Sequence, residues 1–523
     1  MPPTALTTAD EPNAAAVSRR GLLSGVSVLG ALAGTAVLSG AAALVPQEAE
    51  ASGFDPVAHL LRRTTYGMNP DQIYAVHKQG ADKWLAAQLN PYTKVADTAM
   101  DHLASRWPRL KLDIWQVRQH LDNGSWDVML DLVDVHIARA VWSRRQLLEV
   151  MVDFWSNHFN ITCPSSDVWD SRHRFDRDVI RKNAFGRFED MLIASAKHPA
   201  MLNYLNNVDS TKFEPNENYG RELLELHTVG ISGGYNEKDM RNSALIMTGM
   251  SIDESEQGGG GYMYKLYNHH TGPVKVMKFH AGNGNPDGQA VVTAYLKYLA
   301  NHQATAYHLC GKLVTRFVSD VPHPALVKRL VHVYLTSGTA IKPVLLALFA
   351  SPEFKHSAGQ KVRTPYEDLI ATLRALKFGP DRKGTDGIRA LQYVSSNVGQ
   401  PPLAWSEPNG YPDFASSWSS SSATLGRWNA HMQLAAGWWP DTLTRTQLRA
   451  MLPKSPPVTL GEVIDTLAAK LSIAPLPASH RGAIAGFLGR TPSSRIADDD
   501  EAIGWRLPYI AALLLDSPTH VKR

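Results

Sequence analysis

The chain reads Asn216-Glu217-Asn218-Tyr219-Gly220-Arg221-Glu222-Leu223-Leu224-Glu225-Leu226-His227-Thr228-Val229-Gly230 at the point that decides its fold. Apolar residues recur in this stretch at helical spacing. On a helical wheel the centre of the apolar face is made by Tyr219, Leu223, Leu226 and Gly230. The pattern predicts a helix that buries one face, and Gly230 and the glycines after it are suited to end that helix.

The polar residues of this stretch fall into two groups. Glu217, Arg221 and Glu225 lie opposite the apolar face at i, i+4 spacing, which is typical of a solvent-exposed ladder that contributes a few tenths of a kcal/mol per pair. Glu222 and His227 flank the apolar stripe on its two edges, and Asn218 precedes Glu222 by one turn. These edge positions predict partly buried polar groups that meet a neighbouring helix.

A carboxylate and a histidine on such edges are suited to acid–base chemistry or to a metal site completed from elsewhere. The alternative is that Glu222 and His227 only close hydrogen bonds between helices. The Glu-x-x-His pair of di-iron bundles is absent, because Glu225 and His227 are two positions apart.

Helical periodicity dominates the rest of the chain and predicts an all-α fold. Long amphipathic runs cover residues 138–157, 217–229, 237–249, 304–318 and 325–336. Capping signals predict further helix starts at Thr364-Pro365-Tyr366-Glu367, Thr459-Leu460-Gly461-Glu462 and Ser351-Pro352-Glu353.

One segment has strand character. Residues 262–267 and 274–279 alternate around Asn268-His269-His270-Thr271-Gly272-Pro273, which predicts a small β-hairpin near 262–279. Glycine-rich flanks surround it, so residues 258–288 are predicted to be an insert in a helical body.

The N-terminus resembles an export signal. Ser18-Arg19-Arg20-Gly21-Leu22-Leu23 is similar to the twin-arginine motif, and Ala49-Glu50-Ala51 offers small residues to a signal peptidase. We therefore expect residues 1–51 to be a signal peptide, Ser52 to begin the mature chain, and the protein to be extracytoplasmic or secreted. The alternative is an uncleaved N-terminal anchor. The remaining chain is predicted to contain a main helical domain, 52–378, and a C-terminal helical region, 379–523, packed on it.

Composition narrows the function classes. The net charge is only +4 and no basic run stands out, which argues against a nucleic-acid partner. Cys163 and Cys310 are the only cysteines, so the chain is not a disulfide scaffold. The two alternatives are a disulfide bond between them and two free buried thiols, and the sequence does not decide between these.

A second histidine of interest ends another predicted helix. His158 in Trp155-Ser156-Asn157-His158-Phe159 continues an apolar stripe, so its ring is predicted to point inward. A lone histidine on an apolar face is often a satisfied core residue. The adjacent Asn157 and the second inward histidine, His227, favour a function.

His269 and His270 lie at the turn of the predicted hairpin and are metal candidates. His280 lies beyond the return strand, on the order of 20 Å away at ~3.3 Å per residue. The hairpin tip, with Lys275, is predicted to act as a lid over another site.

Several motifs together resemble the bacterial family DUF1800, a family of unknown function. They are Asp55-Pro56-x-x-His59-Leu60-Leu61-Arg62-Arg63, Trp155-x-Asn157-His158-Phe159, the stretch 216–230, Gly234-Tyr235-Asn236-Glu237-x-Asp239, Thr248-Gly249, Lys312-Leu313-x-x-Arg316-Phe317-Val318, Ser351-Pro352-Glu353-Phe354, Gly399-Gln400-x-Pro402 and Gly410-Tyr411-Pro412. The resemblance implies a mainly helical fold, export, and the frequent company of a second exported family of unknown function, but no assigned reaction. The chain departs from the family pattern at Met250, where tryptophan is usual, and at His270-Thr271, where an aspartate is usual.

Two functions are open. The first is an exported enzyme, metal- or cofactor-dependent, whose site contains His158, Asn157, Asn218, Glu222 and His227; the sequence does not identify the cofactor. The second is a non-catalytic envelope or assembly protein in which the same groups fix helix packing. A single site requires His158 to lie within about 10 Å of the edge formed by Glu222 and His227.

Overall fold

Helix starts follow the capping signals of the sequence. The structure is a computed structural model that describes residues 55–455 and 458–523. Thr364 accepts a hydrogen bond from the Glu367 amide and the Glu367 carboxylate accepts one from the Thr364 amide, which starts α19. The same capping box at Thr459 starts α22, and Ser351 caps α18. The predicted twin-arginine motif and cleavage site lie outside the described residues.

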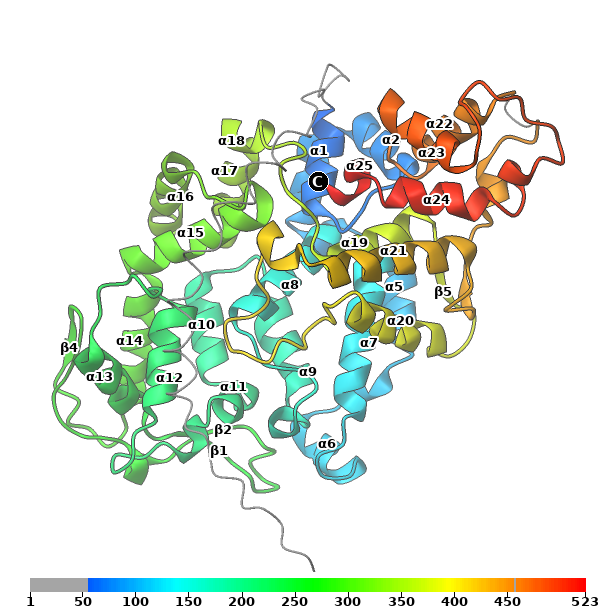
Figure 1. Cartoon of the computed structure of the whole chain (residues 1–523). Coiled ribbons are helices and arrows are strands. Elements are labelled where there is room, and N and C mark those ends of the chain that lie inside the picture. Colours follow the sequence, from blue (N-terminus) through cyan, green and yellow to red (C-terminus); the bar gives the residue numbers. More distant parts are fainter. Residues whose placement is uncertain (1–54, 456–457) are drawn as a thin grey trace, which may run out of the picture. The chain divides into compact units, whose positions relative to one another are not determined.

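Helices account for most of the described chain (Figure 1). The α-helices are α1 Pro56–Thr64, α2 Pro70–Gln79, α3 Ala81–Gln88, α4 Pro91–Lys94, α5 Thr98–Ala104, α6 Ile114–His120, α7 Asp127–Trp142, α8 Gln146–His158, α9 Arg172–Phe175, α10 Phe188–Ala196, α11 Pro199–Tyr204, α12 Glu217–Glu222, α13 Glu237–Met247, α14 Gln289–Ala300, α15 Gln303–Phe317, α16 Pro324–Thr336, α17 Ile341–Ala350, α18 Pro352–Lys355, α19 Pro365–Ala375, α20 Asp386–Asn397, α21 Ser421–Ala436, α22 Leu460–Lys470, α23 Ala478–Phe487, α24 Leu507–Leu515 and α25 Pro518–Val521. Two π-helical segments, η4 Asp176–Arg181 and η6 Leu223–His227, continue α9 and α12. The mainly helical fold is confirmed.

The helical prediction for 138–157 is wrong at one point, because two helices share this run. Ser143 adopts extended backbone after α7, and its hydroxyl donates to Asp97 Oδ2 at 2.7 Å. The Arg144 amide donates to the same oxygen at 2.9 Å. These hydrogen bonds to Asp97, which is far away in the sequence, accompany the end of α7 and the start of α8 in a new direction.

The stretch 216–230 is not one regular α-helix. It is α-helical as α12 and then widens into the π-helical η6 over Leu223–His227. Gly230, at φ +80°, ends it, and its amide donates to the Leu224 carbonyl at 3.0 Å. A wheel drawn at 3.6 residues per turn therefore misplaces the side chains after Leu223.

Strands form three two-stranded sheets within the described residues. β1 (Met250–Ile252) pairs with β2 (Tyr262–Tyr264), β3 (Val274–Val276) with β4 (Phe279–Ala281), and β5 (Gly379–Asp381) with β6 (Leu443–Thr444). The predicted pairing of 262–267 with 274–279 is wrong. β2 instead pairs with β1, which precedes it, and β3 pairs with β4 across a tight turn made by Met277, at φ +54°.

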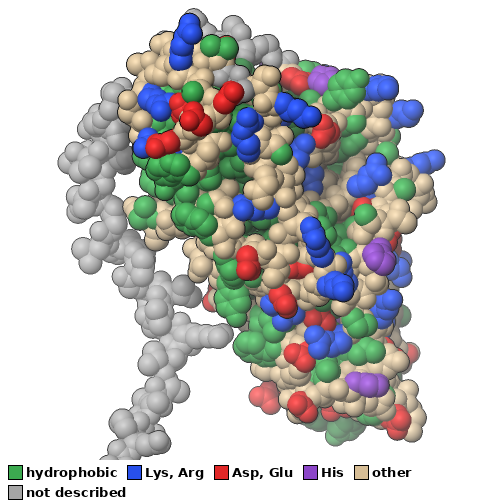
Figure 2. Space-filling view, turned by 90° about the vertical axis from the view of Figure 1, so that its right-hand side faces the viewer, with side chains coloured by type: hydrophobic (Ala, Val, Ile, Leu, Met, Phe, Trp, Pro, Cys, Tyr) green, Lys and Arg blue, Asp and Glu red, His purple; other side chains and the backbone are tan. Residues whose placement is uncertain are grey.

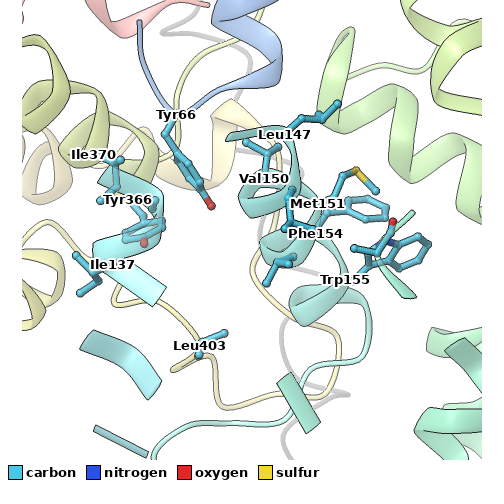
Figure 3. Close-up of a cluster of buried hydrophobic side chains, with 14 of the residues drawn as sticks. Tyr66, Ile137, Leu147, Val150, Met151, Phe154, Trp155, Tyr366, Ile370 and Leu403 are labelled. Atoms are coloured by element: carbon cyan, nitrogen blue, oxygen red, sulfur yellow. The ribbon is translucent and has the colours of Figure 1, made fainter. Parts of the chain in front are cut away.

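The core is built around α8. Its apolar side contributes Leu147, Val150, Met151, Phe154 and Trp155, which are drawn in Figure 3. The rings of Tyr66 and Tyr366 meet edge to face beside this helix, with their centroids 5.8 Å apart. The other side of α8 is therefore left for polar contacts.

Residues Asp55–Arg523 form one compact unit. Elements on the two sides of the predicted boundary at 378 pack together, since α20 lies against α7 and α21 against α19. None of the described helices combines the length and the apolar character needed to cross a bilayer. On the face shown in Figure 2, acidic and basic side chains are interspersed.

Candidate functional site

Polar side chains at four-residue spacing connect α8 and α15. His308, Lys312 and Arg316 lie on one face of α15, and Asp153 and Asn157 lie one turn apart on α8. Lys312 Nζ lies 3.3 Å from His158 Nδ1, and Arg316 Nη2 lies 3.6 Å from Asp153 Oδ2. We call these six residues, His158 included, together with the polar side chains that contact them from other elements, the polar seam.

One end of the polar seam, the histidine end, gathers three imidazoles and an amine: His158, His227, His308 and Lys312. The ring centroid of His158 lies 6.4 Å from that of His227 and 5.9 Å from that of His308. His158 and His227 are each 1% exposed. The two inward histidines of the sequence therefore meet, well inside the distance that a single site requires.

The hydrogen bonds of His158 fix its tautomer. Nε2 lies 3.1 Å from the carbonyl oxygen of His227, and a carbonyl oxygen only accepts, so Nε2 carries the proton. Nδ1 therefore accepts a hydrogen bond from the amine of Lys312. Burial, together with the charge of Lys312, holds the pKa of His158 well below its usual range, so this ring is neutral.

His308 is held in the complementary way. Its Nδ1 donates to the carbonyl oxygen of Thr228 at 2.8 Å, which leaves Nε2 with its lone pair and no partner in the described structure. Burial and the charge of Lys312 lower the pKa of His308 to about 4. The side chain is half-buried rather than fully enclosed.

His227 and Lys312 complete the histidine end. His227 Nε2 is buried and has no hydrogen-bond partner in the described structure, and burial lowers its pKa to about 3. Burial also lowers the pKa of Lys312 to about 8, although the negative charge of Asp413 acts to raise it. The amine thus loses its proton more easily than that of an exposed lysine.

The other end of the polar seam, the charged end, consists of Asp153, Arg316, Glu367, Asp413 and Arg523. Arg316 Nη1 and Arg523 Nη1 lie 2.8 and 2.9 Å from Glu367 Oε1. Burial alone raises the pKa of Glu367, but the two guanidinium groups lower it to about 2. Burial raises the pKa of Asp153 to about 6 in spite of Arg316.

The loop 399–413 contacts the polar seam through Asn157 and Arg316, and Asn157 and Asn160 anchor it. The Tyr411 amide donates to Asn157 Oδ1 at 3.0 Å. Asn160 Nδ2 donates to the carbonyl oxygens of Trp405 and Glu407 at 2.9 and 2.7 Å. Gly410, at φ +71°, passes so close to the Asn157 carbonyl that a Cβ would overlap it. Asn157 therefore positions the loop that carries Asp413.

The family described as "Protein of unknown function (DUF1800)" matches residues 59–521. The chain belongs to this family. No curated protein and no solved structure matches it. The motif residues His158, Lys312, Arg316 and Tyr411 of this DUF1800 member, distant in sequence, all lie at the polar seam.

Two of the residues expected in the DUF1800 site lie apart from the histidines. Glu222 is half-buried, and burial and the charge of Glu225 raise its pKa. Asn218 is exposed. Among the described contacts, no hydrogen bond or ion pair links either side chain to His158, His227 or His308. Of the predicted ladder, the Arg221–Glu225 pair is found at 3.5 Å between half-buried side chains, while Glu217 lies 4.0 Å from Arg241 instead.

The hairpin histidines are also held separately. His269 is buried, with Nδ1 3.0 Å from the Thr248 carbonyl oxygen and Nε2 2.9 Å from Asn283 Oδ1, so both ring nitrogens have protein partners. The His270 amide donates to the Thr248 hydroxyl. Lys275 is exposed on β3.

The metal-binding potential of the described residues lies elsewhere in the fold. Among them, three His, Cys, Asp or Glu side chains bring ligand atoms within 4.8 Å of one another at Asp368, His431 and His520, but not at the histidine end.

Cys163 and Cys310 are free and buried, and burial raises the pKa of each thiol to about 12. Of the two open alternatives, the structure has two free thiols.

Two clefts of about 460 and 410 Å³ also lie away from the polar seam. The first is lined by residues of α6 and α11 and by Gly259 and Gly261, and the second includes Arg118, Trp169 and Asp170. Neither contains a site residue expected from the sequence.

Sequence reasoning missed His308, Lys312, Arg316, Asp153 and Asp413 as site residues. A signal for three of them was present, because His308, Lys312 and Arg316 repeat every four residues in a run that is otherwise largely apolar. No local signal marks Asp413, which reaches the seam through the loop.

Proposed function

We propose that this protein is an extracytoplasmic enzyme that transfers protons at the histidine end of the polar seam. The observation that carries this proposal is His308: its Nδ1 donates to the Thr228 carbonyl oxygen, while Nε2 has no described partner on a side chain that is only half-buried. A neutral imidazole held in this way is suited to act as a general base.

Lys312 supplies the complementary charge. Its amine lies 3.3 Å from Nδ1 of the neutral His158 ring, and its charge also acts on His308. The ammonium group can therefore stabilise negative charge that develops on a substrate when His308 removes a proton. His158, bonded to the amine on one side and to the His227 carbonyl on the other, orients Lys312. Asn157 holds the covering loop.

The described residues do not bring three ligand atoms within 4.8 Å of one another at the histidine end. The two nitrogens without partners, His308 Nε2 and His227 Nε2, are the atoms there that would meet an added metal ion or another cofactor. Assays of the purified protein are therefore to be run with and without added divalent metal ions.

A panel of chromogenic esters, phosphate esters and glycosides tests the proposal. We expect turnover of at least one class by the wild type, and a loss of about 100-fold or more in His308→Gln. The matched control is His332→Gln, an exposed histidine on α16, which should retain full activity. Equal turnover by the wild type and His308→Gln would contradict the assignment of the base.

The alternative, a non-catalytic envelope or assembly protein, is favoured by one observation. The charged end of the seam is extensively paired, which is typical of a network that fixes helix packing. On this alternative, His308→Gln changes the free energy of unfolding, and no substrate class is turned over by the wild type.

We further propose that the protein is exported by the twin-arginine route, as the sequence at Ser18–Leu23 supports, and acts beside a second exported protein of unknown function. Replacement of Arg19 and Arg20 by lysine should retain the protein in the cytoplasm, and the exported wild type should begin at Ser52. A wild type found only in the cytoplasm would rule out this localisation. Co-purification from the exported fraction tests the partner.

A further inference from the structure

A separate cluster of ligand-type side chains lies where the last helices meet α19. Asp368 comes from α19, His431 from α21 and His520 from α25. One ligand atom from each residue lies within 4.8 Å of the other two. The three side chains are 0%, 2% and 5% exposed, so they face one another away from solvent.

The contacts within this cluster do not satisfy its polar atoms. His431 Nε2 lies 3.1 Å from Asp368 Oδ2, and His520 Nε2 lies 3.5 Å from Asp368 Oδ1. Neither contact is well aligned for a hydrogen bond, so both Asp368 oxygens and His431 Nε2 are held chiefly by the charges of His431, His520 and Arg427. Leaving a buried carboxylate in this state is costly, and a cation among these atoms removes the cost.

A second carboxylate orients one of the ligands. Asp516, at the end of α24, lies 2.7 Å from His431 Nδ1. This contact directs the opposite nitrogen, Nε2, towards Asp368. A carboxylate behind a histidine is the usual support of a histidine that binds a metal.

We propose that Asp368, His431 and His520 bind one divalent transition-metal ion, with zinc as the best fit. Two imidazole nitrogens and one carboxylate oxygen form a donor set that suits zinc and related ions. A water molecule would complete the coordination, and the metal would replace the present contact of His520 Nε2 with Thr372 Oγ1 at 3.2 Å. Because every ligand is buried, the ion has a structural role and does not meet substrate.

The ion would fasten the end of the chain to the main helical body. Its ligands come from α19, α21 and α25, and the supporting carboxylate follows α24, so one centre joins four helices. This site is distinct from the histidine end and does not depend on the proposed enzymatic activity.

The competing explanation is an ion cluster without metal, in which His431 is a cation between Asp368 and Asp516. The positive groups that face the cluster include Arg427 beside Asp368, and Arg363 and Arg62 beside His520. Their charges oppose a metal ion, so the experiment must separate the two explanations directly.

The first measurement is the metal content of the full-length exported protein, prepared without an affinity tag or chelator. We expect about one metal ion per chain in the wild type and in the control His332→Gln. We expect less than about a tenth of that in His431→Gln and His520→Gln. Removal of the ion with a chelator should lower the Tm of the wild type and leave that of the two variants unchanged.

The second measurement needs no variant and so does not depend on the variants folding. Wild-type protein stripped of metal and titrated with Co²⁺ should give the visible absorption bands of a four-coordinate site, saturating at one ion per chain. The proposal is overturned if Co²⁺ gives no such bands and ¹⁵N NMR shows both nitrogens of His431 protonated.

Discussion

The two ends of the polar seam lie one helical turn apart on α15 and have opposite character. At Arg316 the buried groups are charged and paired, with Glu367 held between two guanidinium groups. At Lys312 and His308 the surroundings favour neutral forms, and two imidazole nitrogens have no partner. Paired charges hold helices together, whereas neutral groups with free lone pairs can exchange protons. Within one pair of helices, the charged end is therefore suited to hold the structure together and the histidine end is suited to proton transfer.

The largest effect is expected at the charged end. Arg316→Met leaves Glu367, Asp153 and Asp413 without one of their cations in a buried position, so the free energy of unfolding should fall by about 3–5 kcal/mol. Urea denaturation of the variant and the wild type measures this loss in the free energy of unfolding. The control, Arg329→Met, breaks an exposed pair with Glu353 and should cost no more than about 1 kcal/mol. Equal losses in the two variants would contradict the contrast between buried and exposed pairs.

A smaller effect with a defined pH dependence is expected at Asp153. Its folded pKa of about 6 lies above the value of 3.8 for an exposed aspartate, so the unfolded chain loses this proton first as the pH rises. Asp153 therefore lowers stability progressively between about pH 4 and pH 6. Relative to the wild type, Asp153→Asn should become more stable by about 2–3 kcal/mol across this window, at 1.36 kcal/mol per pKa unit. The exposed control Asp498→Asn should show no such change. A difference in the free energy of unfolding between Asp153→Asn and the wild type that does not vary with pH would refute the raised pKa of Asp153.

At the histidine end we expect a shift of pKa. Lys312→Met removes a positive charge that disfavours protonation of His308 and His158, so the pKa of His308 should rise from about 4 by up to about one unit, or about 1.4 kcal/mol. Histidine NMR titration measures it. Lys297→Met, on the exposed side of α14, is the control and should leave His308 unchanged. A fall in the pKa of His308 would show that Lys312 is not its neighbour in solution.

The smallest effect is expected on the exposed ladder. Arg221→Ala removes pairs with Glu225 at 3.5 Å and Glu237 at 3.1 Å, and should cost no more than about 0.5 kcal/mol in thermal or urea unfolding. A loss above 2 kcal/mol would mean that this face is buried against something that the isolated chain does not show.

Local signals predicted much of the helical fold, because capping boxes and amphipathic runs act over a few residues. Thr364 and Thr459 start helices as expected, and the run 304–318 is α15 within a residue at each end. The hairpin pairing and the break at Ser143 depended on partners far along the chain or on turn geometry without a glycine signal. Sequence reasoning could not anticipate them.

The site was predictable only in part, for the same physical reason. The inward direction of His158 followed from an apolar stripe on a regular helix. Asn218 and Glu222 were included on the basis of a regular wheel, and neither contacts the histidines. Asp413 and Glu367 acquire their partners only through tertiary packing, which no spacing rule in a single sequence reveals.

The widened turn at Leu223–His227 has a consequence for the length of the chain. A π-helical segment accommodates one more residue than the α-helix that would otherwise join the same two ends. Deleting Leu226 would remove that surplus, and an α-helix of one residue fewer would then join the same two ends and leave Thr228 in place against His308. Inserting one residue would instead add a second surplus residue and turn the residues that follow by about 100° relative to α12. This segment should therefore tolerate the loss of one residue better than the gain of one.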